Sequence, residues 1–192
     1  NIMEGPKVQA FATFEKDLLN DLIPYIEKNF PVLKNQKNRA LAGLSMGGGQ
    51  SLNFGLGNLN TFAWVGGFSS APNTKSPQEL MPNVKNAKKK LKLLWISCGD
   101  KDGLISFSKR THDYMLANQV QHVYQVIPNG YHDFKVWKND LFLFSQLIFK
   151  PVDPSTFSRY GLHGKVPETN VRRAKYPQIT SDSRAIFRIK AP

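Results

Sequence analysis

The chain has 192 residues, of which 41% are hydrophobic and 21% are charged. This length and balance predict one globular core and exclude a disordered chain. A single cysteine, Cys98, excludes an internal disulfide and a cysteine-cluster metal site. No apolar run approaches the roughly 20 residues that cross a bilayer, so we expect no membrane partner.

The formal net charge of +12 raises the question of a nucleic-acid partner. The basic residues are spread along the chain, however, and residues 151–192 hold eight Lys or Arg and three Asp or Glu. The one dense cluster, Lys88, Lys89 and Lys90, precedes an apolar segment, where a solvated loop is expected. No helix-turn-helix, zinc-finger or RNA-binding pattern accompanies it. We therefore predict no nucleic-acid partner.

The first predicted element is a helix from Thr13 to about Asn29. Its apolar side chains recur at i, i+4 spacing along one face: Phe14, Leu18, Leu22 and Ile26. Pro24 lies within this pattern and is expected to bend the helix.

Strands and helices alternate after this first helix. Apolar runs predict strands over residues 39–44, 62–68, 91–98 and 123–127. Helices are expected from Gly47 onward, over residues 105–118 and over residues 134–149, with a loop over residues 69–82. This order predicts a small parallel sheet covered by helices on both faces. Sites in such sheets form beyond the carboxyl ends of the strands.

The segment Gly43-Leu44-Ser45-Met46-Gly47 lies where the first strand meets the following helix. A G-x-S-x-G sequence on a strand-to-helix turn is the nucleophile elbow of α/β-hydrolases. Both glycines are expected to be needed because the turn is too tight for β-carbons beside the serine. The serine oxygen then projects above the sheet edge, and the N-terminus of the helix faces the charge that develops during attack.

A serine nucleophile needs an imidazole base, which in turn needs a carboxylate, in chain order Ser, Asp or Glu, His. His132 follows the last predicted strand through a tight turn and is the expected base. His112 lies within a predicted helix as a packing or surface residue, whereas His122 and His163 are poorly placed.

The carboxylate partner is expected just after the third predicted strand. Asp100 and Asp102 both follow that strand, and physical reasoning alone does not separate them. Asp133 adjoins His132 and is expected to cap the final helix instead.

Three segments of the chain together resemble the bacterial feruloyl esterases of the first carbohydrate esterase family, which are related to esterase D. They are residues 41–50 around Ser45, residues 98–104 around Asp102 and residues 130–138 around His132. The resemblance extends over about residues 11–149. It implies an α/β-hydrolase fold and hydrolysis of ferulate esters on arabinoxylan side chains, through an acyl-enzyme and without a cofactor.

The resemblance also implies individual roles. It assigns Ser45 as nucleophile, His132 as base and Asp102, rather than Asp100, as acid, with the Met46 N–H as one oxyanion donor. The second donor of the family lies on a loop after an earlier strand, so we expect this chain to lack the leading strands and that donor.

An aromatic and apolar wall suits a phenolic acyl group. Trp137 and the segment that begins with Phe68 and Ser69 are therefore the expected substrate-binding residues.

The character of the chain changes at Pro151, after which prolines recur and helical periodicity ends. We predict an esterase domain over residues 1–150, followed by a tail over residues 151–192 that holds a linker and one strand over residues 183–190. Residues 176–179 and 184–192 resemble the opening of an immunoglobulin-like carbohydrate-binding module. The resemblance implies a secreted or periplasmic parent with fused carbohydrate-binding or xylanase modules.

Other functions remain compatible with the sequence. An acetylxylan or enterochelin-type esterase would use the same three residues. A catalytically inactive carbohydrate-binding fragment would bind xylan without turnover, and a basic nucleic-acid binder would show an affinity that falls steeply with salt.

Overall fold

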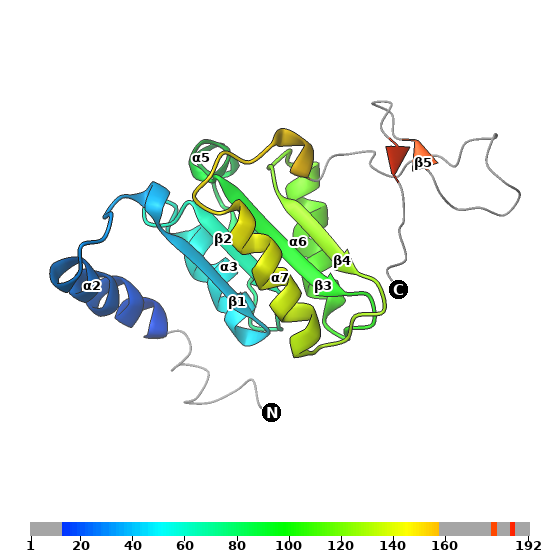
Figure 1. Cartoon of the computed structure of the whole chain (residues 1–192), viewed down its shortest axis with the longest axis horizontal. Coiled ribbons are helices and arrows are strands. Elements are labelled where there is room, and N and C mark those ends of the chain that lie inside the picture. Colours follow the sequence, from blue (N-terminus) through cyan, green and yellow to red (C-terminus); the bar gives the residue numbers. More distant parts are fainter. Residues whose placement is uncertain (1–12, 158–177, 180–184, 187–192) are drawn as a thin grey trace, which may run out of the picture. The chain divides into compact units, whose positions relative to one another are not determined.

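A four-stranded parallel sheet forms the centre of the computed structural model, which describes residues 13–157, 178–179 and 185–186. The strand order is β1-β2-β3-β4, and each neighbouring pair is parallel (Figure 1). The strands are β1 (Ala40–Leu44), β2 (Trp64–Phe68), β3 (Leu93–Gly99) and β4 (Val123–Ile127). All four predicted strands are confirmed. The third begins later than predicted because the Leu91 N–H instead closes the preceding helix on the Ala87 carbonyl (2.9 Å).

The sheet is buried on both faces by side chains that alternate along each strand. Every residue of β3 is buried. Leu93 and Trp95 belong to one apolar cluster, and Leu94 and Ile96 belong to the other. This is why the strand reads as an unbroken apolar run rather than an alternating pattern.

The helices form a layer on each face of the sheet. The helix α3 (Met46–Gly57) follows β1, and the helices α4 (Pro77–Leu80) and α5 (Val84–Lys90) follow β2. The helix α6 (Ile105–Ala117) follows β3, and α7 (Phe134–Leu147) follows β4. In Figure 1, α7 crosses one face of the sheet, and α3 and α6 lie behind it. Phe144 of α7 joins the cluster of Trp95, while Leu52 of α3 and Met115 of α6 join the cluster of Ile96. The predicted two-layer covering is confirmed.

The N-terminal helix differs from the expected regular pattern. Residues 13–16 are helical, η1 (Asp17–Leu22) is a π-helical stretch and α2 (Ile23–Asn29) is an α-helix. Pro24 lies in the first turn of α2, just after the π-helical stretch, where the missing N–H of proline is accommodated. Leu18 is buried, but Leu22 is 47% exposed, so the predicted apolar face is only partly covered.

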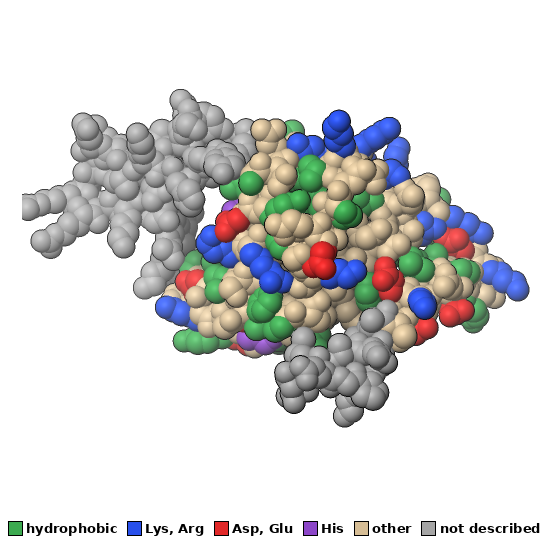
Figure 2. Space-filling view, turned by 180° about the vertical axis from the view of Figure 1, so that it is seen from behind, with side chains coloured by type: hydrophobic (Ala, Val, Ile, Leu, Met, Phe, Trp, Pro, Cys, Tyr) green, Lys and Arg blue, Asp and Glu red, His purple; other side chains and the backbone are tan. Residues whose placement is uncertain are grey.

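Two expected loops contain helices. Residues 69–82 include α4, which Ser76 and Glu79 begin with a capping box. Lys88, Lys89 and Lys90 form the last turn of α5, where basic side chains interact favourably with the helix dipole. Figure 2 shows the molecule from behind the view of Figure 1, and Lys and Arg side chains are spread over this face with several acidic side chains among them.

The chain divides into two compact units, Asn1–Phe157 and Ser158–Pro192. Before the boundary, η2 (Gln36–Asn38) and η3 (Pro154–Thr156) are single 3-10 turns. Beyond it, β5 (Gln178–Ile179) pairs antiparallel with β6 (Ala185–Ile186), so the prediction of a lone strand was wrong. His163 lies outside the described residues, as does most of the segment that resembles a carbohydrate-binding module. No helix among the described residues is long and apolar enough to cross a membrane.

Candidate active site

Ser45 forms a strained turn between β1 and α3. Its φ of 53° and ψ of −121° lie in a region that residues with a side chain rarely adopt. The turn is fixed by the Ser45 N–H, which donates to the Phe68 carbonyl (2.9 Å), and by the Ala71 N–H, which donates to the Ser45 carbonyl (3.0 Å). The hydroxyl therefore has a fixed position at the carboxyl end of β1, as the G-x-S-x-G sequence predicts.

The two glycines of the elbow are not equivalent. A β-carbon on Gly43 would lie 2.4 Å from the Gly47 carbonyl oxygen, so no side chain fits at this position. A β-carbon on Gly47 would meet nothing within 4 Å. The expectation that both glycines are sterically required is therefore correct for Gly43 and wrong for Gly47.

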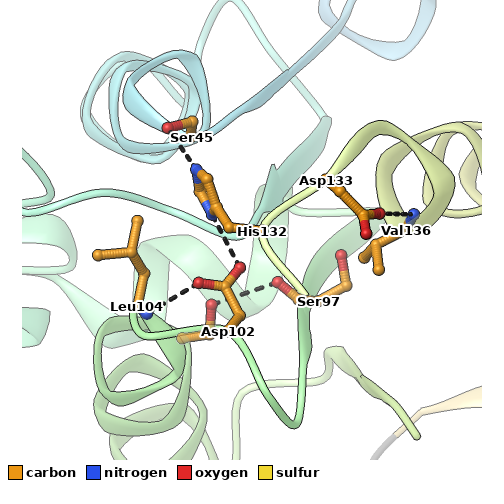
Figure 3. Close-up of polar contacts among 8 residues, drawn as sticks. Ser45, Ser97, Asp102, Leu104, His132, Asp133 and Val136 are labelled. Carbon is orange, nitrogen blue, oxygen red and sulfur yellow. Dashed lines mark hydrogen bonds and ion pairs between the residues drawn. The ribbon is translucent and has the colours of Figure 1, made fainter. Parts of the chain in front are cut away.

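Three side chains from different loops meet in a hydrogen-bonded line (Figure 3). His132 Nε2 lies 3.0 Å from Ser45 Oγ, and His132 Nδ1 lies 2.8 Å from Asp102 Oδ2. Asp102 is buried, whereas Asp100 is exposed. The geometry thus separates the two aspartates that the sequence pattern left open.

Backbone contacts hold the loops after β3 and β4 together. The Asp100 N–H donates to the Ile127 carbonyl (3.0 Å), and the Lys101 N–H donates to the Gly130 carbonyl (2.9 Å). A β-carbon on Gly99 would lie 2.2 Å from the Gly130 carbonyl oxygen. This close approach positions the loop of Asp102 against the loop of His132.

Asp102 is held as a carboxylate. Burial by itself raises the pKa of this carboxyl, but hydrogen bonds from the Leu104 N–H (2.8 Å to Oδ1) and from His132, together with the nearby Ser69 hydroxyl, outweigh it. The net pKa of Asp102 is therefore lowered. A charged carboxylate fixes the Nδ1–H tautomer of His132 and leaves Nε2 facing the serine as the proton acceptor.

Met46 is the first residue of α3 and follows Ser45 directly. N–H groups in the first turn of a helix have no partner within the helix, and the helix dipole makes this end favourable for negative charge. The backbone at Met46 is thus suited to bind an oxyanion formed at Ser45.

The residues expected to bind substrate have different positions. The Trp137 ring packs edge-on against the His132 ring, with centroids 4.8 Å apart. Trp137 and Phe68 both line an apolar cavity of about 390 Å³. Ser69 is fully buried and does not line this cavity. The prediction that Ser69 binds substrate is therefore corrected.

Leu44 and Phe134 are among the further residues that line the cavity and that sequence reasoning missed. Leu44 is 38% exposed and Phe134 is 70% exposed. Both directly adjoin residues that the motifs single out, Leu44 before Ser45 and Phe134 after the helix cap at Asp133. Their position next to these residues is the signal that could have identified them.

The other described histidines bind each other. His112 Nδ1 lies 2.8 Å from His122 Nε2, and His122 Nδ1 lies 2.7 Å from the Val120 carbonyl oxygen. Burial lowers the pKa of His122 to about 4. Asp133 caps α7, as predicted, because its Oδ1 accepts a hydrogen bond from the Val136 N–H (3.1 Å).

The parallel sheet, the strained elbow and the Ser-His-Asp line define an α/β-hydrolase fold, and the comparisons with known proteins give the family. The chain belongs to the esterase family, because the family model with the description "Putative esterase" matches residues 3–146.

Two relatives in this comparison are feruloyl esterases. An endo-1,4-beta-xylanase/feruloyl esterase of Xylanibacter ruminicola is 33% identical over 137 residues, which are 71% of this chain and 18% of that protein. The structure of a ferulic acid esterase from Anaeromyces mucronatus in complex with ferulic acid has a TM-score of 0.65 at 25% identity. The match covers 73% of this chain and 55% of that chain.

A second similar structure is the enterobactin esterase of Shigella flexneri. Its TM-score is 0.52 at 20% identity, and the match covers 69% of this chain and 37% of that chain. This likeness concerns the fold alone.

Proposed function

We propose that the chain is the catalytic part of a serine carboxylic ester hydrolase that releases ferulate or a related hydroxycinnamate. The observation that carries this proposal is the line from Ser45 Oγ through His132 to the buried Asp102 carboxylate, with separations of 3.0 Å and 2.8 Å. The chain spans only part of the length of its feruloyl esterase relatives. The activity of the whole protein is therefore part of the proposal.

In the proposed mechanism, Ser45 Oγ attacks the ester carbonyl while His132 Nε2 takes the hydroxyl proton. Asp102 holds the His132 Nδ1–H and stabilises the imidazolium that forms. The Met46 N–H donates to the oxyanion of the tetrahedral intermediate. When the carbon–oxygen bond to the sugar breaks, His132 returns the proton to the leaving hydroxyl, and an acyl-enzyme remains on Ser45. Water then repeats the sequence, with His132 again as the base, and releases the acid.

The proposed substrate is a feruloyl ester on an arabinoxylan side chain. An apolar cavity whose lining includes Phe68, Phe134 and Trp137 offers aromatic surfaces to a phenolic ring. The names of the two feruloyl esterase relatives support the same acyl group. We extend the proposal to a secreted or periplasmic parent with fused xylanase or carbohydrate-binding modules, since the Xylanibacter relative combines both activities in its name.

An acetylxylan or enterochelin-type esterase is the second candidate. The structural likeness to an enterobactin esterase is compatible with this candidate and, at 20% identity, concerns the fold alone. Relative rates on methyl ferulate, acetylated xylan and a catecholate ester would separate the candidates.

The test is ferulate release from methyl ferulate by the chain and by Ser45→Ala, with covalent labelling by a fluorophosphonate probe followed by intact mass. We expect release and single labelling that both depend on Ser45. Equal release by Ser45→Ala would contradict the mechanism. A folded chain that binds xylan but shows neither release nor labelling would support the inactive binding fragment instead.

A further inference from the structure

The loop after β2 contacts both peptide groups beside Met46, at the start of α3. The Ala71 N–H donates to the Ser45 carbonyl (3.0 Å), which belongs to the peptide before Met46. The Asn73 side-chain amide donates from Nδ2 to the Met46 carbonyl (2.9 Å), which belongs to the peptide after it. Met46, whose N–H is the proposed oxyanion donor, is therefore held on both sides by one loop.

The peptide before Met46 carries the oxyanion donor itself. A trans peptide is planar, so the Ser45 carbonyl and the Met46 N–H point in opposite directions within one plane. The Ser45 carbonyl accepts hydrogen bonds from the Ala71 N–H and also from the Gly49 N–H (3.1 Å), which restrict the tilt of this plane. The bond from Asn73 restricts the next plane. Together these bonds give the Met46 N–H a defined direction.

The Asn73 side chain packs into the first turn of α3, against Gly49. A β-carbon on Gly49 would lie 2.4 Å from Asn73 Oδ1 and 2.9 Å from Nδ2, and its three nearest atoms would all belong to the Asn73 amide. No side chain fits at position 49 while the amide keeps this place. The contact with Met46 thus depends on a glycine one turn into the helix.

The other amide atom of Asn73 indicates that this contact is not made for stability alone. Asn73 Oδ1 is buried, and none of the described groups makes a hydrogen bond with it, which is unfavourable for folding. The loop has further anchors, because Asn53 Nδ2 donates to the Asn73 carbonyl (2.9 Å) and Thr74 Oγ1 donates to the Ala71 carbonyl (2.6 Å). The loop is therefore closed without the Asn73 side chain, whose own hydrogen bond acts on Met46.

We propose that Asn73 is a positioning residue whose side-chain amide holds the Met46 backbone, and with it the oxyanion donor, in the orientation that ester hydrolysis requires. This inference rests on the proposed function. During attack by Ser45, negative charge develops on the ester oxygen, and a donor is effective only where it already points at that position. Loss of the Asn73 amide lets the Met46 N–H turn away. The chemical step then slows, while substrate binding and the Asp102–His132 pair are unchanged.

Four variants separate this contact from the loop. Asn73→Ala removes the amide. Thr74→Val is the matched control, since it removes a hydrogen bond within the same loop and leaves the contacts of Met46 in place. Gly49→Ala puts a methyl group where the Asn73 amide lies, and the double variant Gly49→Ala/Asn73→Ala has room for that methyl group.

The first measurements are kcat and KM on methyl ferulate and the rate of fluorophosphonate labelling. For Asn73→Ala we expect kcat and the labelling rate to fall roughly ten- to a hundredfold, less than for loss of a whole oxyanion donor, with KM within about twofold of wild type. Gly49→Ala should lose a similar factor, and the double variant should be no slower than Asn73→Ala alone. Thr74→Val should lower the unfolding temperature and keep the wild-type kcat.

NMR measures the backbone and the base directly. In Asn73→Ala the residual dipolar coupling of the Met46 N–H, which reports its direction, should change, or its order parameter should fall below the value of about 0.85 for rigid backbone. The titration midpoint of His132 should stay at its wild-type value. Thr74→Val should change neither the Met46 N–H nor the His132 midpoint.

Wild-type kcat and an unchanged Met46 N–H in Asn73→Ala would overturn the proposal. Equal losses of kcat in Thr74→Val would also overturn it, because closure of the loop would then be the cause. Fully additive losses in the double variant would contradict the packing of Asn73 against Gly49 on which it depends. If the wild-type chain were neither labelled nor active, the proposed function would fail, and the Met46 N–H in Asn73→Ala and Thr74→Val would still decide whether Asn73 holds this backbone.

Discussion

Two carboxyl groups beside β3 are both almost inaccessible to solvent, and their pKa values shift in opposite directions. Asp102 is in the loop after β3 and is 3% exposed, while Asp140 is in α7, on the other face of the strand from α6, and is 0% exposed. The pKa of Asp102 is lowered, because hydrogen bonds outweigh the effect of burial. Burial raises the pKa of Asp140 to about 7, and the nearby Ser97 hydroxyl opposes it only in part. Asp102 differs from Asp140 in having several hydrogen-bond donors that stabilise its charged form against the effect of burial.

The surroundings of Asp140 contain several polar groups without partners. Within the described ranges, neither oxygen of Asp140 makes a hydrogen bond, and the same is true of Ser97 Oγ and the indole nitrogens of Trp95 and Trp137. Trp95 and Ser97 are two residues apart in β3 and therefore lie on the same face of the sheet. Trp137 precedes Asp140 by about one turn of α7. The surroundings of Asp102 therefore favour a charged carboxylate, whereas the surroundings of Asp140 favour the neutral carboxyl.

The largest expected effect comes from removal of the charge at Asp102. Asp102→Asn keeps the shape but leaves His132 in the wrong tautomer, and in serine hydrolases such a change lowers kcat by roughly a thousand- to ten-thousandfold. We expect a loss of this size on methyl ferulate, with KM little changed. Asp100→Asn is the matched control because Asp100 is exposed. A comparable loss in Asp100→Asn would mean that the acid has been wrongly assigned.

Asp140 is expected to act on stability, in a direction set by pH. Its pKa is about 7 in the folded chain and near 4 when unfolded, so between these values only the folded state binds the proton. The stabilising contribution of this proton is complete below about pH 4 and is lost as the pH rises through 7. Three pKa units correspond to roughly 4 kcal/mol in the free energy of unfolding.

Asp140→Asn removes this dependence. Relative to wild type, the variant should gain stability as the pH rises from about 4.5 to 8 in urea unfolding, with little change in kcat near pH 6. A difference that stays constant over this range would show that Asp140 does not titrate as described.

These two carboxyls also show how far the sequence predicts the molecule. The strands and the elbow are predicted by apolar runs and by one serine between glycines, because both are local patterns. The choice of Asp102 over Asp100 depended on a resemblance, since two aspartates in one turn differ only in which of them the fold buries. Asp140 follows Lys138 and Asn139 in a helix and looks like a surface carboxylate, and its burial depends on packing against β3.

Ser69 illustrates the same limit. Its place in an apolar segment suggested contact with substrate, but Ser69 is fully buried, and this burial depends on packing that the sequence does not show. Gly47 shows another error of sequence reasoning. Its place in the motif suggested that only glycine fits there, but an added β-carbon would meet nothing within 4 Å.

The smallest expected effect concerns Asp133, a third carboxyl that lies along the chain between His132 and Asp140. It is partly exposed and caps α7 through the Val136 N–H (3.1 Å). Asp133→Ala should lower the free energy of unfolding by about 1 kcal/mol, whereas Asp133→Ser, which keeps a capping oxygen, should lower it by a few tenths. Urea unfolding of both variants at pH 6 measures this difference.

Activity distinguishes the cap from the catalytic acid. The loop of His132 is fixed separately by the backbone contact between Lys101 and Gly130, so kcat of Asp133→Ala should stay within about threefold of wild type. A larger loss that Asp133→Ser restores would mean that the start of α7, and not the Asp102 side of the site alone, sets the position of the imidazole. In that case α7, which carries Asp140, would also affect catalysis. The comparison of Asp102 and Asp140 instead indicates that the catalytic acid and the carboxyl of α7 act separately.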